Sequence, residues 1–385
     1  METLFVNNHS CISKIRDMQI IKNILYLVLI LNTCISCHKN SDNTYFNGEI
    51  QTIEDSIKDV KKVTLKVVSL DGANFGWLST YDSLMFFLNP KLTDRFYNIF
   101  NIDTGKEIGT FCNKGGGPDE VSTFGPIFHL FEEKGELKTL LFAPNEEKLF
   151  IWNITQSIQQ GTTIMDKMFP YTWRTENGGA PYLLMFLQDK NTLIAELQSF
   201  PLNEEEATLP AYQKRTLDTN KLLGSYSSYK KSIKNGAASI FPESFFYSND
   251  AFKPDKTKVV QAMANLPQLN ILDIETGQVV GYRMKNGPDF SLFETDRQIK
   301  KYFTRVQADD NYIYTLYWGK EHWGRFEIPY MNTIYVFNWQ GNLIRKLETD
   351  RGLDQMWIDP IRNRLYVTSP KVDDVFYLDL NGLFD

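Results

Sequence analysis

The side chains best suited to chemistry gather in one segment, Tyr317-Trp-Gly-Lys-Glu-His-Trp-Gly-Arg-Phe-Glu-Ile-Pro-Tyr330. It lies between two predicted strands and is too long for a tight hairpin. Flat aromatic rings beside charged donors suit sugar rings, peptides or acidic ligands, and functional residues concentrate on loops held by a rigid scaffold. An alternative is that the tryptophans pack under the sheet while the charged groups are solvated. The ligand-binding candidates are Trp318, Lys320, His322, Trp323 and Arg325.

The sequence offers little for covalent or metal catalysis. Beyond the N-terminal region, the histidines are His129 and His322, and that part of the chain contains no HExxH, CxxC or GxSxG motif. We therefore name no catalytic residue and no metal ligand, and any cofactor is unknown. Asp and Glu are numerous, so paired carboxylates that meet in space remain an alternative that the sequence does not locate.

A glycine-rich segment, Gly115-Gly-Gly-Pro-Asp-Glu120, superficially resembles a phosphate-binding loop. It lacks the GK[ST] ending and a following helix whose N-terminus would face an anion. A structural turn is the better interpretation, because glycines allow a tight turn, proline fixes it, and Asp119 or Glu120 can accept backbone N–H bonds. The predicted turn residues are Gly115, Gly116, Gly117 and Pro118.

The N-terminal segment has the order of a secretory signal. A basic start at Met18–Lys22 precedes the apolar run Ile24–Leu31, which is far shorter than the roughly 20 residues that span a bilayer. The ending Ile35-Ser36-Cys37 resembles the lipobox of bacterial lipoproteins, with Cys37 as the lipidated residue. Two alternatives stay open: a lipobox ending at Cys34, or an ordinary cleaved signal.

These features divide the chain into three parts. Residues 1–37 are the signal region, and Met18 is the expected true start. Residues 38–62 are polar, without periodicity, and are predicted to be a tether. Export and acylation leave Cys112 as the remaining thiol, so we expect no intrachain disulfide.

Composition limits the partners and the fold class. The formal net charge is −6 and no basic stripe is present, which excludes nucleic acid as an expected partner. Aromatic residues make up 14% of the chain, which favours strands. Short runs of Val, Ile, Leu, Phe and Tyr, such as Leu193-Ile-Ala-Glu-Leu197, alternate with turn residues. The best helical candidates are 204–212 and 295–303, and both are short.

A hairpin motif recurs along the chain: an apolar residue, then Asn or Asp, a short turn with Gly or Asn, and a second strand. The polar side chain can bond its own backbone at the turn. A repeat of roughly 50 residues built from strands is typical of propeller blades. The six polar positions are Asn101, Asn153, Asp218, Asp273, Asn338 and Asp379.

We therefore predict an all-β fold, a six-bladed β-propeller of four-stranded antiparallel blades over residues 63–385. A propeller usually closes its ring by completing one blade from both termini. The chain ends soon after the sixth hairpin, so that blade lacks an outer strand. We expect Val63–Leu70 to supply it.

The segment Phe111-Cys-Asn-Lys-Gly-Gly-Gly-Pro-Asp-Glu-Val121 resembles the G-x-G-P-x-E-F element of TolB-like and NHL-like six-bladed propeller lipoproteins, which are abundant in Bacteroidetes. Val121 replaces the usual Phe. The C-terminal stretch Tyr312–Leu380 resembles the last two blades of that family. The resemblance covers most of the mature chain and implies a lipid-anchored six-bladed propeller, although a fold shared so widely does not fix function.

Two functions are expected from this reading. The first is a non-catalytic binding or scaffolding module in the cell envelope, anchored to the outer membrane and facing the periplasm or the surface, with a protein, peptide or glycan partner. The second is an exported lyase or hydrolase that uses carboxylates or a metal in the central channel. Two or more carboxylates or histidines facing the channel axis would favour the enzyme. Aromatic side chains at the channel mouth would favour binding.

Overall fold

The computed structural model describes residues 41–55, 57, 60–72, 75–117, 120–172, 182–198, 200–201, 206–230, 232–234, 241–295, 299–321 and 330–384. The predicted signal region and Cys37 lie outside these residues. Residues 45–385 form one compact unit. None of the helices in the described ranges is long and apolar enough to cross a membrane.

The described residues of this unit form six blades. The first has strands β4 (Trp77–Tyr81), β5 (Leu84–Leu88), β6 (Arg95–Asn101) and β7 (Glu107–Asn113); the second has β8 (Leu130–Glu133), β9 (Glu136–Ala143), β10 (Lys148–Asn153) and β11 (Met165–Pro170); the third has β12 (Tyr182–Leu187), β13 (Thr192–Leu197), β16 (Ala211–Thr216) and β17 (Leu222–Tyr226).

The other three blades follow in chain order. The fourth has β19 (Ser248–Phe252), β20 (Lys258–Met263), β21 (Gln268–Asp273) and β22 (Val279–Met284); the fifth has β23 (Lys300–Ala308), β24 (Tyr312–Glu321), β25 (Thr333–Asn338) and β26 (Leu343–Thr349); the sixth has β27 (Met356–Asp359), β28 (Arg364–Ser369) and β29 (Val372–Asp379).

Smaller elements connect or flank the blades. They are the strands β14 (Phe200–Pro201), β15 (Glu206–Thr208) and β18 (Ser232–Lys234), which form a separate small sheet, the helices α2 (Ser41–Tyr45), α3 (Ile154–Gln160) and α4 (Pro242–Phe245), and the 3₁₀ helix η1 (Phe290–Glu294).

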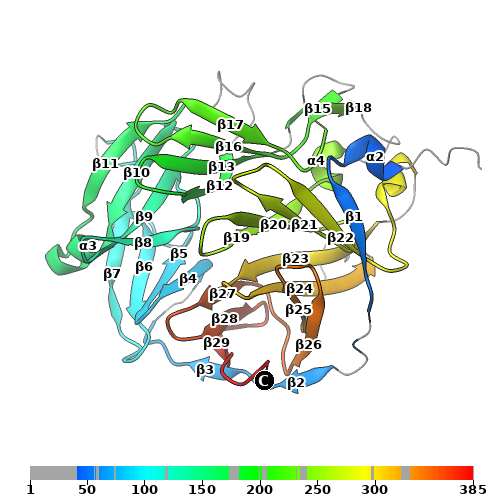
Figure 1. Cartoon of the computed structure of the whole chain (residues 1–385). Helices are drawn as coiled ribbons and strands as arrows, with labels where there is room; N and C mark the ends of the chain where they lie inside the picture. Colours follow the sequence, from blue (N-terminus) through cyan, green and yellow to red (C-terminus); the bar gives the residue numbers. More distant parts are fainter. Residues whose placement is uncertain are drawn as a thin grey trace, which may run out of the picture. The chain divides into compact units, whose positions relative to one another are not determined.

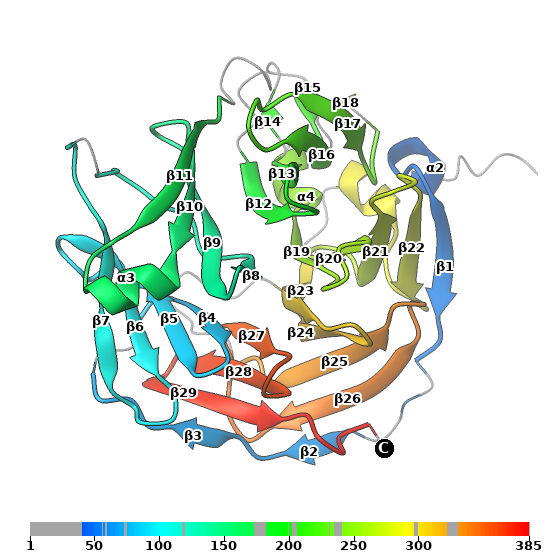
Figure 2. The same ribbon diagram turned by 60° about the vertical axis from the view of Figure 1, so that its left-hand side comes forward.

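The blades surround a common axis, as Figures 1 and 2 show, and the first strand of each blade lies innermost. Within each blade the strands pair antiparallel in sequence order. Buried apolar side chains of neighbouring blades pack together; one such cluster joins Phe86 of the first blade to Leu141 and Trp152 of the second. The prediction of a six-bladed, all-β propeller is confirmed.

The ring closes as the sequence predicts. Strand β3 (Lys66–Val68) pairs antiparallel with β29, with Val68 opposite Val375, and completes the sixth blade. Because an N-terminal strand of the domain shares one sheet with its last strand, the ring cannot open without breaking these hydrogen bonds.

The predicted boundary between tether and propeller is wrong. Strand β1 (Glu49–Ile53) pairs parallel with β22, and β2 (Lys61–Val63) pairs parallel with β26, so each adds a fifth, outer strand to its blade. Both outer strands are largely exposed, with one buried residue in β1 and none in β2, and their polar composition hides the strand signal. The compact unit begins at residue 45 rather than 63.

Both helical candidates are also wrong. Residues 204–212 include β15 and the start of β16, and residues 295–303 run into β23. In β23 the side chains of Tyr302, Thr304, Val306 and Ala308 are buried at every second position. This is the period of a strand, and pairing with β24 outweighs the local helical preference.

Candidate functional site

Two cavities lie along the axis of the propeller. The first, of about 290 Å³, is lined at the N-terminal ends of innermost strands, for example by Trp77 of β4, Ser248 of β19 and Met356 of β27. The second, of about 280 Å³, lies toward the C-terminal ends of the same strands and is lined by Tyr81 and Phe252. Small-molecule sites in proteins are concave and mostly apolar, with a few polar groups, which fits both cavities.

The two cavities adjoin, because several side chains line both. Most of them are apolar or uncharged, and Asp250 is the carboxylate among them. The shared lining residues are Phe128, Leu184, Asp250, Gln307 and Trp357. The channel therefore carries an acidic group where one cavity passes into the other.

A second carboxylate, Glu196 of β13, lines the first cavity and is only 4% exposed. Tyr212 lies opposite Glu196 in the pairing of β13 with β16. The Tyr212 hydroxyl donates to Asp250 Oδ2, and Gln261 Nε2 donates to the same oxygen at 3.2 Å. An acid pair thus spans the interface between the third and fourth blades.

Each carboxylate of the pair keeps an oxygen without a donor. Among the residues that the structure describes, no hydrogen-bond partner lies within reach of Glu196 Oε2 or Asp250 Oδ1, and both atoms are buried. Buried polar atoms are nearly always paired in native proteins. These two oxygens are therefore unusual, and Ser248 Oγ and Arg305 Nε in the lining of the first cavity share this state.

The environment of the pair favours its protonated form. Burial raises the pKa of Asp250 to about 6, although hydrogen bonds from Tyr212 and Gln261 oppose the shift. Burial also raises the pKa of Glu196 well above its usual value, and the nearby charge of Asp250 adds to this shift. Two interacting carboxylates titrate as a pair, so we infer that they share a proton near neutral pH.

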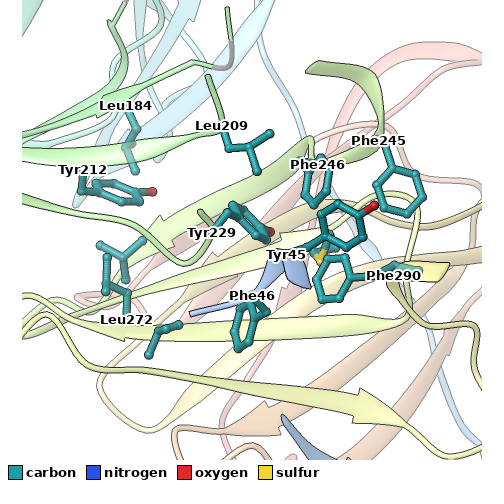
Figure 3. Packing of buried hydrophobic residues seen from close by; sticks show 14 of the residues in the cluster. Tyr45, Phe46, Leu184, Leu209, Tyr212, Tyr229, Phe245, Phe246, Leu272 and Phe290 are labelled. Carbon is teal, nitrogen blue, oxygen red and sulfur yellow. The ribbon is translucent and has the colours of Figure 1, made fainter. Parts of the chain in front are cut away.

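Aromatic packing holds the partners of the pair in place. Tyr212 and Tyr229 belong to a buried cluster with Leu184, Phe246 and Phe290, part of which Figure 3 shows. Burial, together with the charge of Asp250, raises the pKa of both tyrosines. Both phenols therefore stay protonated at any physiological pH; Tyr212 donates to Asp250, and the Tyr229 hydroxyl accepts from Asn270 Nδ2 at 2.9 Å.

The first cavity also has a cationic side chain. The Arg305 guanidinium lies 5.6 Å from the centre of the Trp77 ring, and its Nη2 atom is 3.3 Å from Asp354 Oδ1. Trp77 is 49% exposed, and Tyr247 beside it in the lining is 43% exposed. The cavity mouth thus combines exposed aromatic rings with one guanidinium.

The second cavity contains His129, one of the two histidines noted in the sequence. Burial and the charge of Lys256 lower the pKa of His129 to about 3, so it is neutral. Its Nδ1 atom accepts a hydrogen bond from the Leu187 backbone N–H at 3.2 Å. Within the described ranges, no three His, Cys, Asp or Glu side chains form a group that could hold a metal ion.

The predicted binding loop is described only in part. Trp318 and Lys320 lie near the end of β24, where Lys320 Nζ is 4.8 Å from the centre of the Trp318 ring. Neither lines the two channel cavities. His322, Trp323 and Arg325 lie outside the described residues.

The glycine segment connects the first blade to the second. Gly115 has a φ of +152° and its N–H donates to Val121 O at 3.1 Å. Gly117 N–H donates to Glu120 Oε2 at 2.9 Å. Gly116 lies between them, and Pro118 falls outside the described residues.

The sequence reasoning missed the acid pair. A signal for Glu196 was present, since it is the single charged residue in the strand run Leu193-Ile-Ala-Glu-Leu197. A charge within an otherwise apolar inner strand indicates a special environment. Asp250 gave no such signal, because Ser-Asn-Asp at 248–250 reads as a turn.

Comparison with known proteins agrees with this architecture. Residues 77–360 match the family described as TolB-like 6-blade propeller-like. The structure is similar to that of a DUF4221 family member from Bacteroides vulgatus, with 11% sequence identity, a TM-score of 0.49, and 86% of this chain and 92% of that chain covered. It is also similar to a protein from Bacteroides fragilis, with 11% identity, a TM-score of 0.48, and coverage of 83% and 88%. No curated protein matches the sequence.

Proposed function

Because the chain belongs to the family of TolB-like six-bladed propellers, we propose that it is an exported, lipid-anchored binding module whose ligand enters the central channel. The observation that carries this proposal is the first cavity. It combines exposed aromatic rings at its mouth with charged groups inside, as ligand sites do. The partner is a small molecule or a protruding part of a peptide, protein or glycan, because a cavity of about 290 Å³ admits one side chain or one sugar ring.

The experiment for binding is an array of glycans and peptides probed with the mature, detergent-solubilised protein. Any hit is then measured against two variants. Loss of binding in Trp77→Ala, with binding kept in Trp318→Ala, supports the channel as the site. The reverse pattern supports the loop around Trp318, and binding kept in both variants contradicts both locations.

Anchoring rests on the lipobox-like ending at Cys37. It is tested by labelling cells with a palmitate analogue, in wild type and in Cys37→Ala. Loss of label and release of soluble protein support lipidation of Cys37 and a place in the cell envelope. Retained label in the variant contradicts it, and loss only in Cys34→Ala assigns the anchor to the alternative lipobox.

A second candidate function is an exported hydrolase or lyase, and the Glu196–Asp250 pair is the observation that favours it. Carboxylates whose pKa values are raised and coupled are typical of acid–base catalysis. The test is hydrolysis of chromogenic glycosides and peptides by wild type and by Glu196→Gln. Turnover that disappears in the variant supports the enzyme, whereas binding without turnover supports the binding module.

A further inference from the structure

The two open oxygens of the acid pair receive no hydrogen bond from any other residue that the structure describes. Glu196 is 4% exposed, and its Oε2 atom is buried and unpartnered while its side chain lines the first cavity. Asp250 Oδ1 is also buried and unpartnered, although Oδ2 of the same carboxylate receives two hydrogen bonds. An unpaired buried carboxylate is costly unless a positive donor reaches it.

None of the described basic side chains pairs with the two carboxylates. Arg305, the cation that lines the first cavity, pairs with Asp354 and lies over Trp77. Among the residues that the structure describes, no Lys or Arg forms an ion pair with Glu196 or Asp250. Within the described ranges, the pair therefore has no cationic partner of its own.

Part of the wall around the pair is apolar, and the polar side chains Ser248, Asn249 and Gln307 also line the first cavity. Phe128, Leu184 and Trp357 line both cavities, and Met356 lines the first. Trp357 is fixed, because its indole Nε1 donates to Thr80 O at 3.0 Å. Apolar side chains suit an unbranched alkyl chain. The face of an aromatic ring also attracts an ammonium group.

Resting on the binding function proposed above, we propose that the channel takes an alkylammonium group, as found on a lysine side chain or a free diamine. The alkyl stem packs against Phe128, Leu184 and Trp357. The ammonium N–H groups donate to Glu196 Oε2 and Asp250 Oδ1. An ammonium has three donors and no acceptor, which matches two acceptors that lack donors.

Other cations and ligands fit the same observations less well. Calcium takes six to eight oxygen ligands, and within the described ranges no group of three His, Cys, Asp or Glu side chains is placed to hold a metal ion. A sugar ring carries several hydroxyls, each of which needs a polar partner when buried, and the side chains of Phe128 and Leu184, which line both cavities, offer none. An alkyl stem carries no hydroxyl and therefore needs no polar partner.

Binding of the ammonium must displace the proton that the pair shares. The other titratable or charged groups near the pair are Tyr212, Tyr229, Tyr247, Arg305, His129 and Lys256. The tyrosines stay neutral because their pKa values are raised, and His129 stays neutral because its pKa is lowered. The acid pair is thus the group that titrates near neutrality, and the affinity for the ammonium rises with pH.

The test is isothermal titration calorimetry of the mature, detergent-solubilised protein with cadaverine and with Nα-acetyl-lysine amide. The matched probe is the same lysine derivative acetylated on its side-chain nitrogen, which removes the charge and keeps the stem. Glucosamine and calcium chloride serve as competing chemistries. The variants are Glu196→Gln and Asp250→Asn, with the exposed Glu49→Gln as control, and circular dichroism and thermal melts show that each is folded.

The inference expects binding of one or both amines, no binding of the acetylated probe, and a loss of affinity of about tenfold or more in Glu196→Gln. Preference for the lysine derivative over cadaverine assigns the group to a peptide, and the reverse assigns it to a free diamine. Absence of amine binding at millimolar concentration overturns the inference, as does preference for glucosamine or calcium. If a glycan or peptide needs Trp77 but not Glu196 for binding, the ammonium inference is overturned and the proposed binding function is kept. If no ligand of the array depends on Trp77 or Trp318, the proposed binding function itself fails.

Discussion

Tyr212 of the third blade donates its phenolic hydrogen bond to Asp250 of the fourth blade, across the wall of the central channel. The bond joins two strands, β16 and β19, that belong to different sheets. Asp250 faces both cavities, and Tyr212 is 1% exposed. The orientation of the carboxylate in the channel therefore depends on a side chain that a ligand does not touch.

Removing this donor should destabilise the domain. In Tyr212→Phe, Asp250 Oδ2 loses a charged hydrogen bond while the ring still fills the aromatic cluster, so we expect a loss of about 1–3 kcal/mol in the free energy of unfolding. Urea denaturation followed by tryptophan fluorescence measures it. The control is Tyr330→Phe, whose side chain is 46% exposed, and which should be neutral. Equal effects of the two changes would contradict the role of the bond.

The acid pair should make stability fall as pH rises. The folded-state pKa of Asp250, about 6, exceeds its usual value of 3.8, so folding favours the protonated form. That contribution is present below about pH 4 and is lost as pH rises through about 6. The Asp250→Asn variant has no such loss. We expect the stability of Asp250→Asn relative to wild type to increase between pH 5 and pH 8, by on the order of 2 kcal/mol.

Chemical denaturation of both proteins at each pH provides the measurement. The free energy difference between variant and wild type is the quantity compared, which removes the pH effects of groups that do not interact with Asp250. A difference that stays constant from pH 5 to pH 8 would contradict the raised pKa of Asp250.

The fold was readable from the sequence because its turns repeat. Asn101 Oδ1 accepts from the backbone N–H of Thr104 at 2.9 Å, and Asp273 Oδ1 accepts from that of Thr276 at 2.8 Å, as the hairpin motif predicts. Asn338 bonds the Gln340 N–H in the same way. Asn153 differs, since it caps helix α3 through the Gln156 N–H at 3.0 Å. These are local interactions, and local spacing reports them.

The candidate site was not readable, because its members meet only through blade packing. Glu196 and Asp250 are 54 positions apart in the numbering and lie in different sheets. The pairing of β13 with β16 and the neighbouring position of β19 bring them to one cavity. The aromatic and charged loop around Trp318 drew the prediction instead, since its residues are close in sequence.

The closing strand provides a third prediction with a built-in control. Val68 is 6% exposed and pairs with Val375, whereas its neighbour Val67 is 53% exposed. Val68→Ala should lower the free energy of unfolding by about 1–2 kcal/mol, because buried methyl groups are lost and a cavity is left behind. Val67→Ala should lower it by only a few tenths of that amount. Urea denaturation compares the two, and equal costs would contradict the observed register of β3.

The thiol of Cys112 should be inert until the domain unfolds. Cys112 is fully buried and free, burial raises its pKa well above the usual value, and its backbone N–H is bound to Thr163 Oγ1 at 2.7 Å. Only the thiolate reacts quickly, so both access and ionisation are blocked. We expect no reaction of the native mature protein with a chromogenic disulfide reagent, and stoichiometric reaction in urea. Because acylation would occupy Cys37, the unfolded mature chain should release a single equivalent, and Cys112→Ala should release none. Rapid reaction of the native protein would contradict the buried thiol, and a second equivalent in urea would contradict acylation of Cys37.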